Sequence, residues 1–131
     1  LASNHEQEEN LSEARKALAQ VLLSPVYTSA IWTEPYTPHP APHTPHLSKY
    51  LNQLVSAQTP LDCEELNMRL KEIERAQGRD DEARRHGLVP IDLDLLLYHQ
   101  QRFHQRDWQR PYVQQLLPEV SDQFVVLGED N

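Results

Sequence analysis

The segment that decides the fold is Ile91-Asp92-Leu93-Asp94-Leu95-Leu96-Leu97-Tyr98. Apolar and acidic residues alternate at its start, which is the period of two expected of a β-strand with one buried face. We therefore predict a strand over 90–98. One face carries only aliphatic side chains, which are Ile91, Leu93, Leu95 and Leu97. The opposite face carries Asp92 and Asp94, about 6 to 7 Å apart along an extended chain.

Asp92 and Asp94 admit two interpretations. Either their strand face is exposed to solvent, or a cation holds the two carboxylates together. Aspartate is disfavoured in strands, and Leu96 and Tyr98 on the same face indicate partial cover. Hard oxygen ligands suit magnesium. The residues therefore favour a divalent metal site at Asp92 and Asp94.

Basic residues flank this strand. Magnesium held by carboxylates normally also binds phosphate oxygens, and arginine pairs well with phosphate. The arginines before and after the strand are Arg79, Arg84, Arg85, Arg102, Arg106 and Arg110. A bound polyphosphate is one interpretation of these residues, and a solvated charged surface is the other.

A helix and a loop are expected before the strand. Thr59-Pro60-Leu61-Asp62 supplies a capping hydroxyl, a proline at the first helical position and an acid. Aliphatic residues follow at helical spacing, so we predict a helix over 60–77 that stops at Gly78. The charged residues 79–88 are expected to form a mobile loop.

The N-terminal half is expected to contain one helix and two strands. Aliphatic residues at helical spacing predict a helix over 10–22. Runs of β-branched, aromatic and alternating apolar residues predict strands over 26–32 and 49–58. Between them, residues 35–46 hold five prolines and three histidines, which favour an extended surface loop. We expect no zinc site there, because the loop has no cysteine or carboxylate.

The C-terminal part is expected to contain two short strands and a helix. A polar turn near His99 leads into a return strand, a third helix covers 110–120, and a last strand covers 124–127. This order of elements predicts an α+β sandwich with helices on a mixed or antiparallel sheet. Leu1 and Ala2 resemble the end of a first strand that is truncated here.

Composition limits the class of protein. The chain of 131 residues is 38% apolar and 24% charged, so we expect a single domain over 1–131. A net charge of -8 argues against nucleic acid as a partner. No apolar run reaches the roughly 20 residues that cross a bilayer. The single cysteine, Cys63, and the lack of a signal pattern favour a cytoplasmic protein.

Glycine is scarce and the arginines are concentrated. The chain has only three glycines, so neither a GxxxxGK[ST] loop nor a GxGxxG turn is possible. A nucleotide must then be held by side chains, and residues 69–110 hold nine of the twelve basic residues. Tyr50 and Asn52 share one strand face, which suits a flat heterocycle. The alternative is that both simply belong to the core.

These motifs resemble the 6-hydroxymethyl-7,8-dihydropterin pyrophosphokinase family of folate biosynthesis, over nearly the whole chain. In chain order, the matching pieces are Ala2-Ser3-Asn4, Thr33-Glu34-Pro35, Tyr50-Leu51-Asn52, Ile73-Glu74-Arg75-Ala76-Gln77-Gly78-Arg79, the strand 91–98, and His104 with Arg110 and Tyr112. The paired aspartates are the strongest match.

The resemblance implies a ferredoxin-like sandwich and a monomeric enzyme with small-molecule substrates. The enzyme would transfer pyrophosphate from ATP to the pterin hydroxymethyl group and release AMP. Asp92 and Asp94 would hold two magnesium ions and, with Arg79, would be the catalytic residues. The implied ATP-binding residues are Glu74, Arg79, Leu95, His104 and Arg110. The implied pterin-binding residues are Thr33, Tyr50, Asn52 and Tyr112.

The chain departs from the family pattern at four positions. Val89 stands where the family has an arginine, and Ala2 stands where it has a glycine. Asp81 and His86 replace an expected basic residue and a tryptophan. These departures motivate an alternative, a weakened relative that binds pterin or nucleotide without efficient transfer. A third possibility is an interaction domain without a small ligand.

Overall fold

The structure is a computed structural model that describes residues 1–34, 48–120 and 125–128. Its strands form two sheets, and every strand pair in them is antiparallel. The three-stranded sheet has the order β1 (Ala2–Ser3), β4 (Tyr50–Asn52) and β3 (Ile31–Thr33). The five-stranded sheet has the order β2 (Leu23–Tyr27), β5 (Val55–Gln58), β8 (Val125–Gly128), β6 (Asp94–Tyr98) and β7 (Gln101–Arg102). The predicted α+β class with a mainly antiparallel sheet is confirmed.

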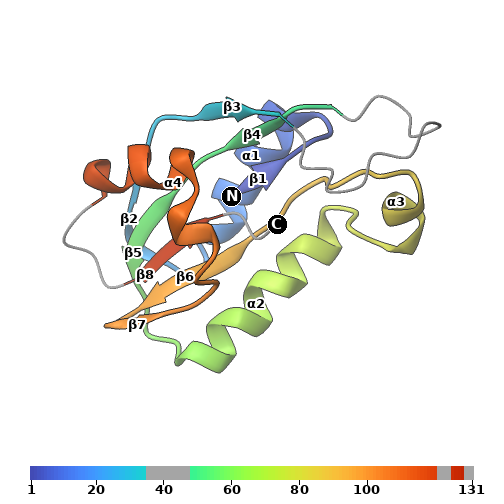
Figure 1. Ribbon diagram of the computed structural model, residues 1–131. Helices are drawn as coiled ribbons and strands as arrows, with labels where there is room; N and C mark the ends of the chain where they lie inside the picture. The colour runs from blue at the N-terminus through green and yellow to red at the C-terminus, as the bar shows by residue number, and fades with distance from the viewer. Residues whose placement is uncertain (35–47, 121–124, 129–131) are drawn as a thin grey trace.

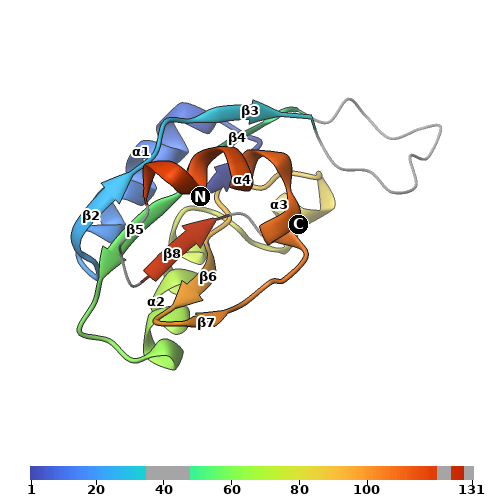
Figure 2. The ribbon, with the colours of Figure 1, turned by 60° about the vertical axis from the view of Figure 1, so that its left-hand side comes forward.

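Helices cover both faces of these strands (Figures 1 and 2). The helices are α1 (Gln7–Leu18), α2 (Cys63–Ala76), α3 (Asp81–Arg85) and α4 (Pro111–Leu116), with 3-10 turns at Asp107–Gln109 and Leu117–Glu119. One core cluster joins α1 and α2 to the sheets and includes Val55 and Leu95. A second cluster joins α4 to the sheets and includes Leu54 and Leu96. Because neighbouring strand residues fall in different clusters, the strands lie between two helical layers.

Two predicted strands are each divided into two. Each of the segments 26–32 and 49–58 forms one strand in the three-stranded sheet and one in the five-stranded sheet. Each segment bends between its two strands. The bends lie against each other, since Thr28 and Leu54 exchange two hydrogen bonds of 3.0 Å through the Thr28 backbone and hydroxyl. Gln53 Nε2 also donates to the Thr28 carbonyl at 2.7 Å. These hydrogen bonds take the place of regular strand pairing at the point where both segments pass from one sheet to the other.

The strand predicted over 90–98 is shorter in the structure, where it is β6, and its pairing contains an irregularity. β6 begins at Asp94, whereas Asp92 makes only a single bridge to Ala2. The pairing of β6 with β8 shifts register between Leu95 and Leu97, as in a β-bulge. The shift reverses the alternation, so Leu97 packs against the α4 cluster rather than sharing the face of Leu95.

Helix boundaries differ from the predictions for local reasons. α1 begins three residues early and ends at Leu18, and α2 begins at Cys63 because Asp62 is its N-cap. Residues 79–88 were expected to form a mobile loop, but they contain α3, which Asp80 caps by accepting from Ala83 N at 2.8 Å. α4 gives way to a 3-10 turn that contains Pro118, which lacks the N–H that a longer α-helix needs. The return strand is confirmed as β7.

Residues 35–46 and 124 lie outside the described residues, so the predicted loop is not described. The predicted last strand corresponds to β8 at Val125–Gly128.

Asn4 fixes the segment that connects α3 to Asp92 and β6. Its side chain donates to the Gly87 carbonyl at 3.0 Å and accepts from Val89 N at 2.6 Å. Its backbone N–H donates to the Val89 carbonyl at 3.0 Å. Asn4 is buried, so these bonds are shielded from water. The first residues of the chain therefore hold α3 and Val89 in place.

We expect Asn4→Ala to lower the free energy of unfolding by about 1 to 3 kcal/mol, because Val89 N–H loses its partner in a partly buried position. Urea denaturation measures this change. Gln105→Ala is the control, since Gln105 is exposed and its side chain makes no hydrogen bond to the described residues; it should shift stability by no more than about 0.5 kcal/mol. Equal stability of the two variants would contradict the role given to Asn4.

Candidate active site

Three residues from distant parts of the chain lie in one row across the sheet. Ala2 pairs with Asn52 on one side and with Asp92 on the other. Directly paired residues of antiparallel strands project from the same face. Two strand spacings separate the Asn52 and Asp92 Cα atoms by about 10 Å. The sheet therefore presents an amide and a carboxylate on one face, with only the Ala2 methyl between them.

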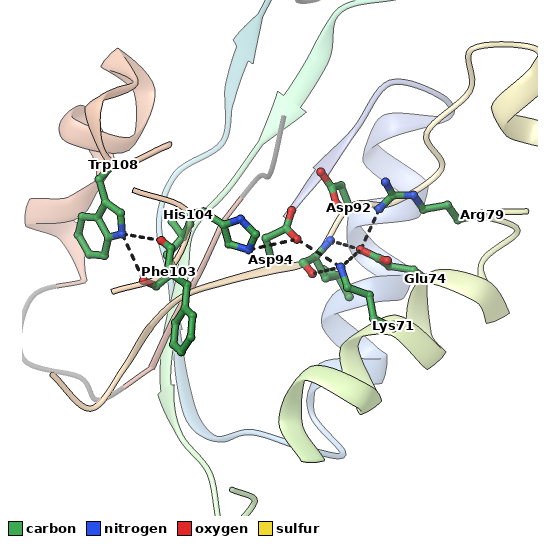
Figure 3. Close-up of polar contacts among 10 residues, drawn as sticks. Lys71, Glu74, Arg79, Asp92, Asp94, Phe103, His104 and Trp108 are labelled. Carbon is green, nitrogen blue, oxygen red and sulfur yellow. Dashed lines mark hydrogen bonds and ion pairs between the residues drawn. The ribbon is translucent and has the colours of Figure 1, made fainter. Parts of the chain in front are cut away.

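Asp92 and Asp94 are buried, so the interpretation that their strand face is exposed to solvent is wrong. Asp92 and Asp94 are each 2% exposed. Arg79 Nη1 lies 2.7 Å from Asp92 Oδ1, and Lys71 Nζ lies 3.3 Å from Asp94 Oδ1 (Figure 3). The three residues expected to be catalytic, Asp92, Asp94 and Arg79, are thus brought into one network.

Glu74 joins both halves of this network. Its Oε2 accepts from Leu93 N at 2.7 Å and lies 3.0 Å from Arg79 Nη1 and 3.4 Å from Lys71 Nζ. Burial raises the pKa of Glu74, and the Leu93 N–H with the two cations opposes that shift only in part. Glu74 therefore ties α2 to the segment of the aspartates. Its expected contact with ATP stays a prediction.

The two cations are held by an excess of buried negative charge. Burial alone would lower the pKa of Lys71, but Asp94 and Glu74 outweigh burial and raise it. The pKa of Arg79 is raised against burial in the same way, chiefly by Asp92 and Glu74. Three carboxylates face two side-chain cations here, which leaves one net negative charge. Such a cluster attracts a further cation.

Lys71 is the site residue that the sequence reasoning missed. It lies one turn before Glu74 on α2, so both side chains project on the same side of the helix. A lysine three residues before a glutamate on a helix is usually read as a surface pair. The sequence does not predict the contact of Lys71 with Asp94, because residues 23 positions apart on a helix and a strand have no fixed spacing.

The pair of aspartates fits magnesium rather than a metal bound wholly by protein. In the described part of the chain, no three His, Cys, Asp or Glu side chains are grouped so that they could hold a metal ion. Beside a nucleotide, Mg²⁺ is typically bound by one or two carboxylates, and its other ligands are water and phosphate oxygens. The hard oxygen donors and the excess negative charge at Asp92 and Asp94 agree with that set.

A cavity of about 400 Å³ lies on one side of Asp94. Leu95 and His104, both expected to bind ATP, line it together with Cys63, Glu64, Asn67, Gln101 and Phe103. His104 Nε2 is 3.9 Å from Asp94 Oδ1, and Figure 3 shows His104 and Lys71 on opposite sides of Asp94. Arg110, the remaining predicted ATP ligand, pairs with Asp107 at 3.1 Å.

The residues expected to bind pterin divide into two groups. Thr33, Tyr50 and Asn52 lie together on β3 and β4, where Thr33 pairs with Tyr50. Asn52 Nδ2 donates to Thr33 Oγ1 at 2.8 Å and to the Ile31 carbonyl at 3.0 Å, while Asn52 Oδ1 is buried without a partner among the described residues. Tyr112 is buried in the α4 core cluster, so its contact with a ligand stays a prediction.

A second cavity, of about 600 Å³, lies between the end of α2 and α3. Its lining residues are Lys71, Glu74, Arg75, Arg79, Asp80, Asp81 and Arg84. Lys71, Glu74 and Arg79 belong to the network around the aspartates, so this cavity opens onto the same site from the other side. Among the helices of the described residues, none is long and apolar enough to span a membrane.

Comparison with known proteins agrees with this arrangement. Residues 1–122 match the family model described as 7,8-dihydro-6-hydroxymethylpterin-pyrophosphokinase. The chain is 31% identical over 113 residues to a folate synthesis bifunctional protein of Arabidopsis thaliana, covering 79% of this chain and 22% of that protein. It is 41% identical over 73 residues to the mitochondrial folate synthesis bifunctional protein of Pisum sativum, covering 50% of this chain and 14% of that protein.

The chain spans about a fifth or less of the length of these relatives. No solved structure matches it. The family match nevertheless extends from Leu1 through β7 and α4, and so includes the row of Asn52, Ala2 and Asp92. The chain belongs to the 7,8-dihydro-6-hydroxymethylpterin-pyrophosphokinase family.

Proposed function

We propose that this chain transfers the pyrophosphoryl group of ATP to the hydroxyl of 6-hydroxymethyl-7,8-dihydropterin, in folate biosynthesis. The observation that carries the proposal is the row of Asn52, Ala2 and Asp92 across the sheet. A pterin ring at Asn52 directs its hydroxymethyl group toward Asp92, and the separation of about 10 Å is close to the length of such a ligand with its substituent. Family membership supports the same activity.

The reaction joins the hydroxyl oxygen of the pterin to the β-phosphorus of ATP. The bond between that phosphorus and the oxygen of the α-phosphate breaks, AMP leaves, and the hydroxyl proton is released. In such transfers the protein acts mainly by positioning the substrates and by balancing charge. Asn52 and Asp92 lie in one row across the sheet, and Asp94 follows two residues after Asp92, so neighbouring strands orient both the acceptor and the phosphates.

Asn52 is arranged to accept a hydrogen bond from the pterin. Its amide nitrogen already donates to Ile31 and Thr33, so only the oxygen remains for a ligand. The partner must therefore be a hydrogen-bond donor, and the N–H groups on the amino-pyrimidine edge of a pterin are such donors. Tyr50 is half-buried two residues before Asn52 on β4, and we assign its ring to stacking on the pterin.

Asp92 and Asp94 would hold magnesium, and two ions match the number of carboxylates. Bound magnesium neutralises phosphate charge and orients the phosphate oxygens. Arg79 and Lys71 hold the two carboxylates in place through contacts of 2.7 and 3.3 Å. We place the adenine base in the 400 Å³ cavity at Leu95 and His104, where Asn67 and Gln101 offer amides to its edge.

A relative that binds ligands without efficient transfer remains the second candidate. Val89 favours it, because this residue between α3 and Asp92 has no charged side chain and its backbone is bound by Asn4. The deciding experiment incubates the protein with ATP, magnesium and hydroxymethyl-dihydropterin and follows AMP formation. Pterin-dependent AMP formation supports transfer. Pterin binding without AMP above background would support the second candidate.

We expect Asp94→Asn to abolish the magnesium dependence of ATP binding and to reduce turnover by about 100-fold or more, because a metal-binding carboxylate contributes several kcal/mol of charge stabilisation. Calorimetric titration of ATP with and without magnesium measures the first effect. The matched control is Asp62→Asn, which keeps the N-cap of α2 and lies outside the site. Unchanged magnesium dependence in Asp94→Asn would show that the metal assignment is wrong.

We expect Asn52→Ala to raise the KM for the pterin by about 10-fold or more, with little change in ATP affinity, since one hydrogen bond to a buried acceptor is lost. Thr33→Ala should have a smaller effect of the same kind, because Thr33 only orients the Asn52 amide. Steady-state kinetics with each substrate varied in turn separates the two substrates. Equal losses for ATP and pterin in Asn52→Ala would contradict its assignment to the pterin.

The other expectations stay predictions. These are a monomer, a cytoplasmic location, small-molecule substrates without nucleic acid, and a single domain over 1–131. Two of the relatives, from Pisum sativum and Arabidopsis thaliana, are named as mitochondrial proteins.

A further inference from the structure

The lining of the cavity between α2 and α3 holds one more cation than carboxylates, because Glu74, Asp80 and Asp81 accompany four basic residues. Four of its seven lining residues are cations, namely Lys71, Arg75, Arg79 and Arg84. Lys71 and Arg79 are engaged with the buried carboxylates. Arg75 and Arg84 make no side-chain hydrogen bond or ion pair with any residue that the structure describes. Two guanidinium groups in this cavity are therefore available to a ligand.

The two arginines come from different helices. Arg75 lies in the last turn of α2, and Arg84 lies in the last turn of α3. Arg85 follows on α3, but its Nε donates to the Asp81 carbonyl at 3.4 Å and it does not line the cavity. Of the two arginines on α3, only Arg84 therefore borders the cavity.

The small helix α3 is a fixed support for Arg84. Ala83 is 7% exposed and packs into the protein, and its carbonyl accepts from Leu88 N at 2.9 Å. Asn4 then holds Gly87 and Val89. Because these contacts hold the C-terminal end of α3, where Arg84 lies, Arg84 needs little ordering of its backbone to bind a ligand.

The position of the cavity indicates which part of a ligand it receives. The cavity at Leu95 and His104 lies on one side of Asp94, and the α2–α3 cavity begins at Lys71 on the other side (Figure 3). A nucleotide with its base in the first cavity passes its phosphates over the aspartates. Its terminal phosphates then extend toward Arg75 and Arg84.

We propose that Arg75 and Arg84 form a clamp for the terminal phosphates of a nucleoside triphosphate, an assignment that rests on the proposed function. Guanidinium groups bind phosphate oxygens in a bidentate geometry that a single lysine cannot reproduce. The clamp supplies two positive charges, whereas the side chain of Val89 supplies none. It selects triphosphates over monophosphates, because a monophosphate ends before it reaches the two arginines.

The test compares Arg75→Gln and Arg84→Gln with one matched control on each helix. Arg69→Gln is the control on α2, where Arg69 pairs with Glu72 on the surface, and Arg85→Gln is the control on α3. The ligands are ATP, AMP and inorganic tripolyphosphate, each titrated with magnesium by calorimetry. All four arginines are exposed, so thermal unfolding should be nearly unchanged and confirms folding of each variant.

We expect Arg75→Gln and Arg84→Gln each to weaken ATP and tripolyphosphate binding by about 10-fold, the loss of one charge-assisted contact, and AMP binding by less than about twofold. The controls should stay within about twofold for all three ligands. If the clamp variants bind tripolyphosphate as the controls do, or if the unaltered protein does not bind it, the clamp is wrong.

Activity separates this outcome from failure of the proposed function. If the protein forms no AMP but binds tripolyphosphate through Arg75 and Arg84, transfer fails and the clamp stands. If it forms AMP and both variants keep the ATP KM of the controls, the clamp fails and transfer stands.

Discussion

The constraint on which the site depends is the burial of three carboxylates, which among the described residues pair with the side-chain cations of Lys71 and Arg79. Asp92, Asp94 and Glu74 are nearly inaccessible to water, and removing one partner from a buried ion pair typically costs about 3 to 5 kcal/mol. The network therefore fixes where α2 lies against the central segment, since Lys71 and Glu74 both belong to that helix. The charge that remains uncompensated is the part available for ligand chemistry.

The row across the sheet shows how a short strand connects the two halves of the site. β1 has only two residues, yet Ala2 is paired on both sides and Asn4 holds the segment that leads from α3 into the strand. The pterin residues on β3 and β4 and the aspartates are therefore coupled through residues 2–4. A larger side chain than that of Ala2 would stand between Asn52 and Asp92, in the space that the proposed substrate crosses.

The aspartates were predictable from sequence because they contradict their surroundings. Two charged residues in an aliphatic strand require a partner, and the structure supplies Arg79 and Lys71. The division of 26–32 and 49–58 into four strands was not predictable, because a run of β-branched and apolar residues shows a strand but not a change of sheet. It depends on contacts such as that of Thr28 with Leu54, which join positions far apart. α3 was missed because only Ala83 among its five residues is buried.

Charge distribution explains how an acidic chain is suited to a polyphosphate ligand. The net charge of -8 acts over the whole surface and is screened within about 10 Å at ordinary ionic strength. In the α2–α3 cavity Lys71 and Arg79 are paired with buried carboxylates, so Arg75 and Arg84 are the cations that remain for a ligand. The carboxylates of Asp80 and Asp81 line the same cavity. With only three glycines, the chain cannot surround phosphates with backbone N–H groups of a glycine-rich loop. Arginines in the last turns of α2 and α3 perform that role, and the contacts of Asn4 with Gly87 and Val89 are what allow the five-residue helix α3 to do so.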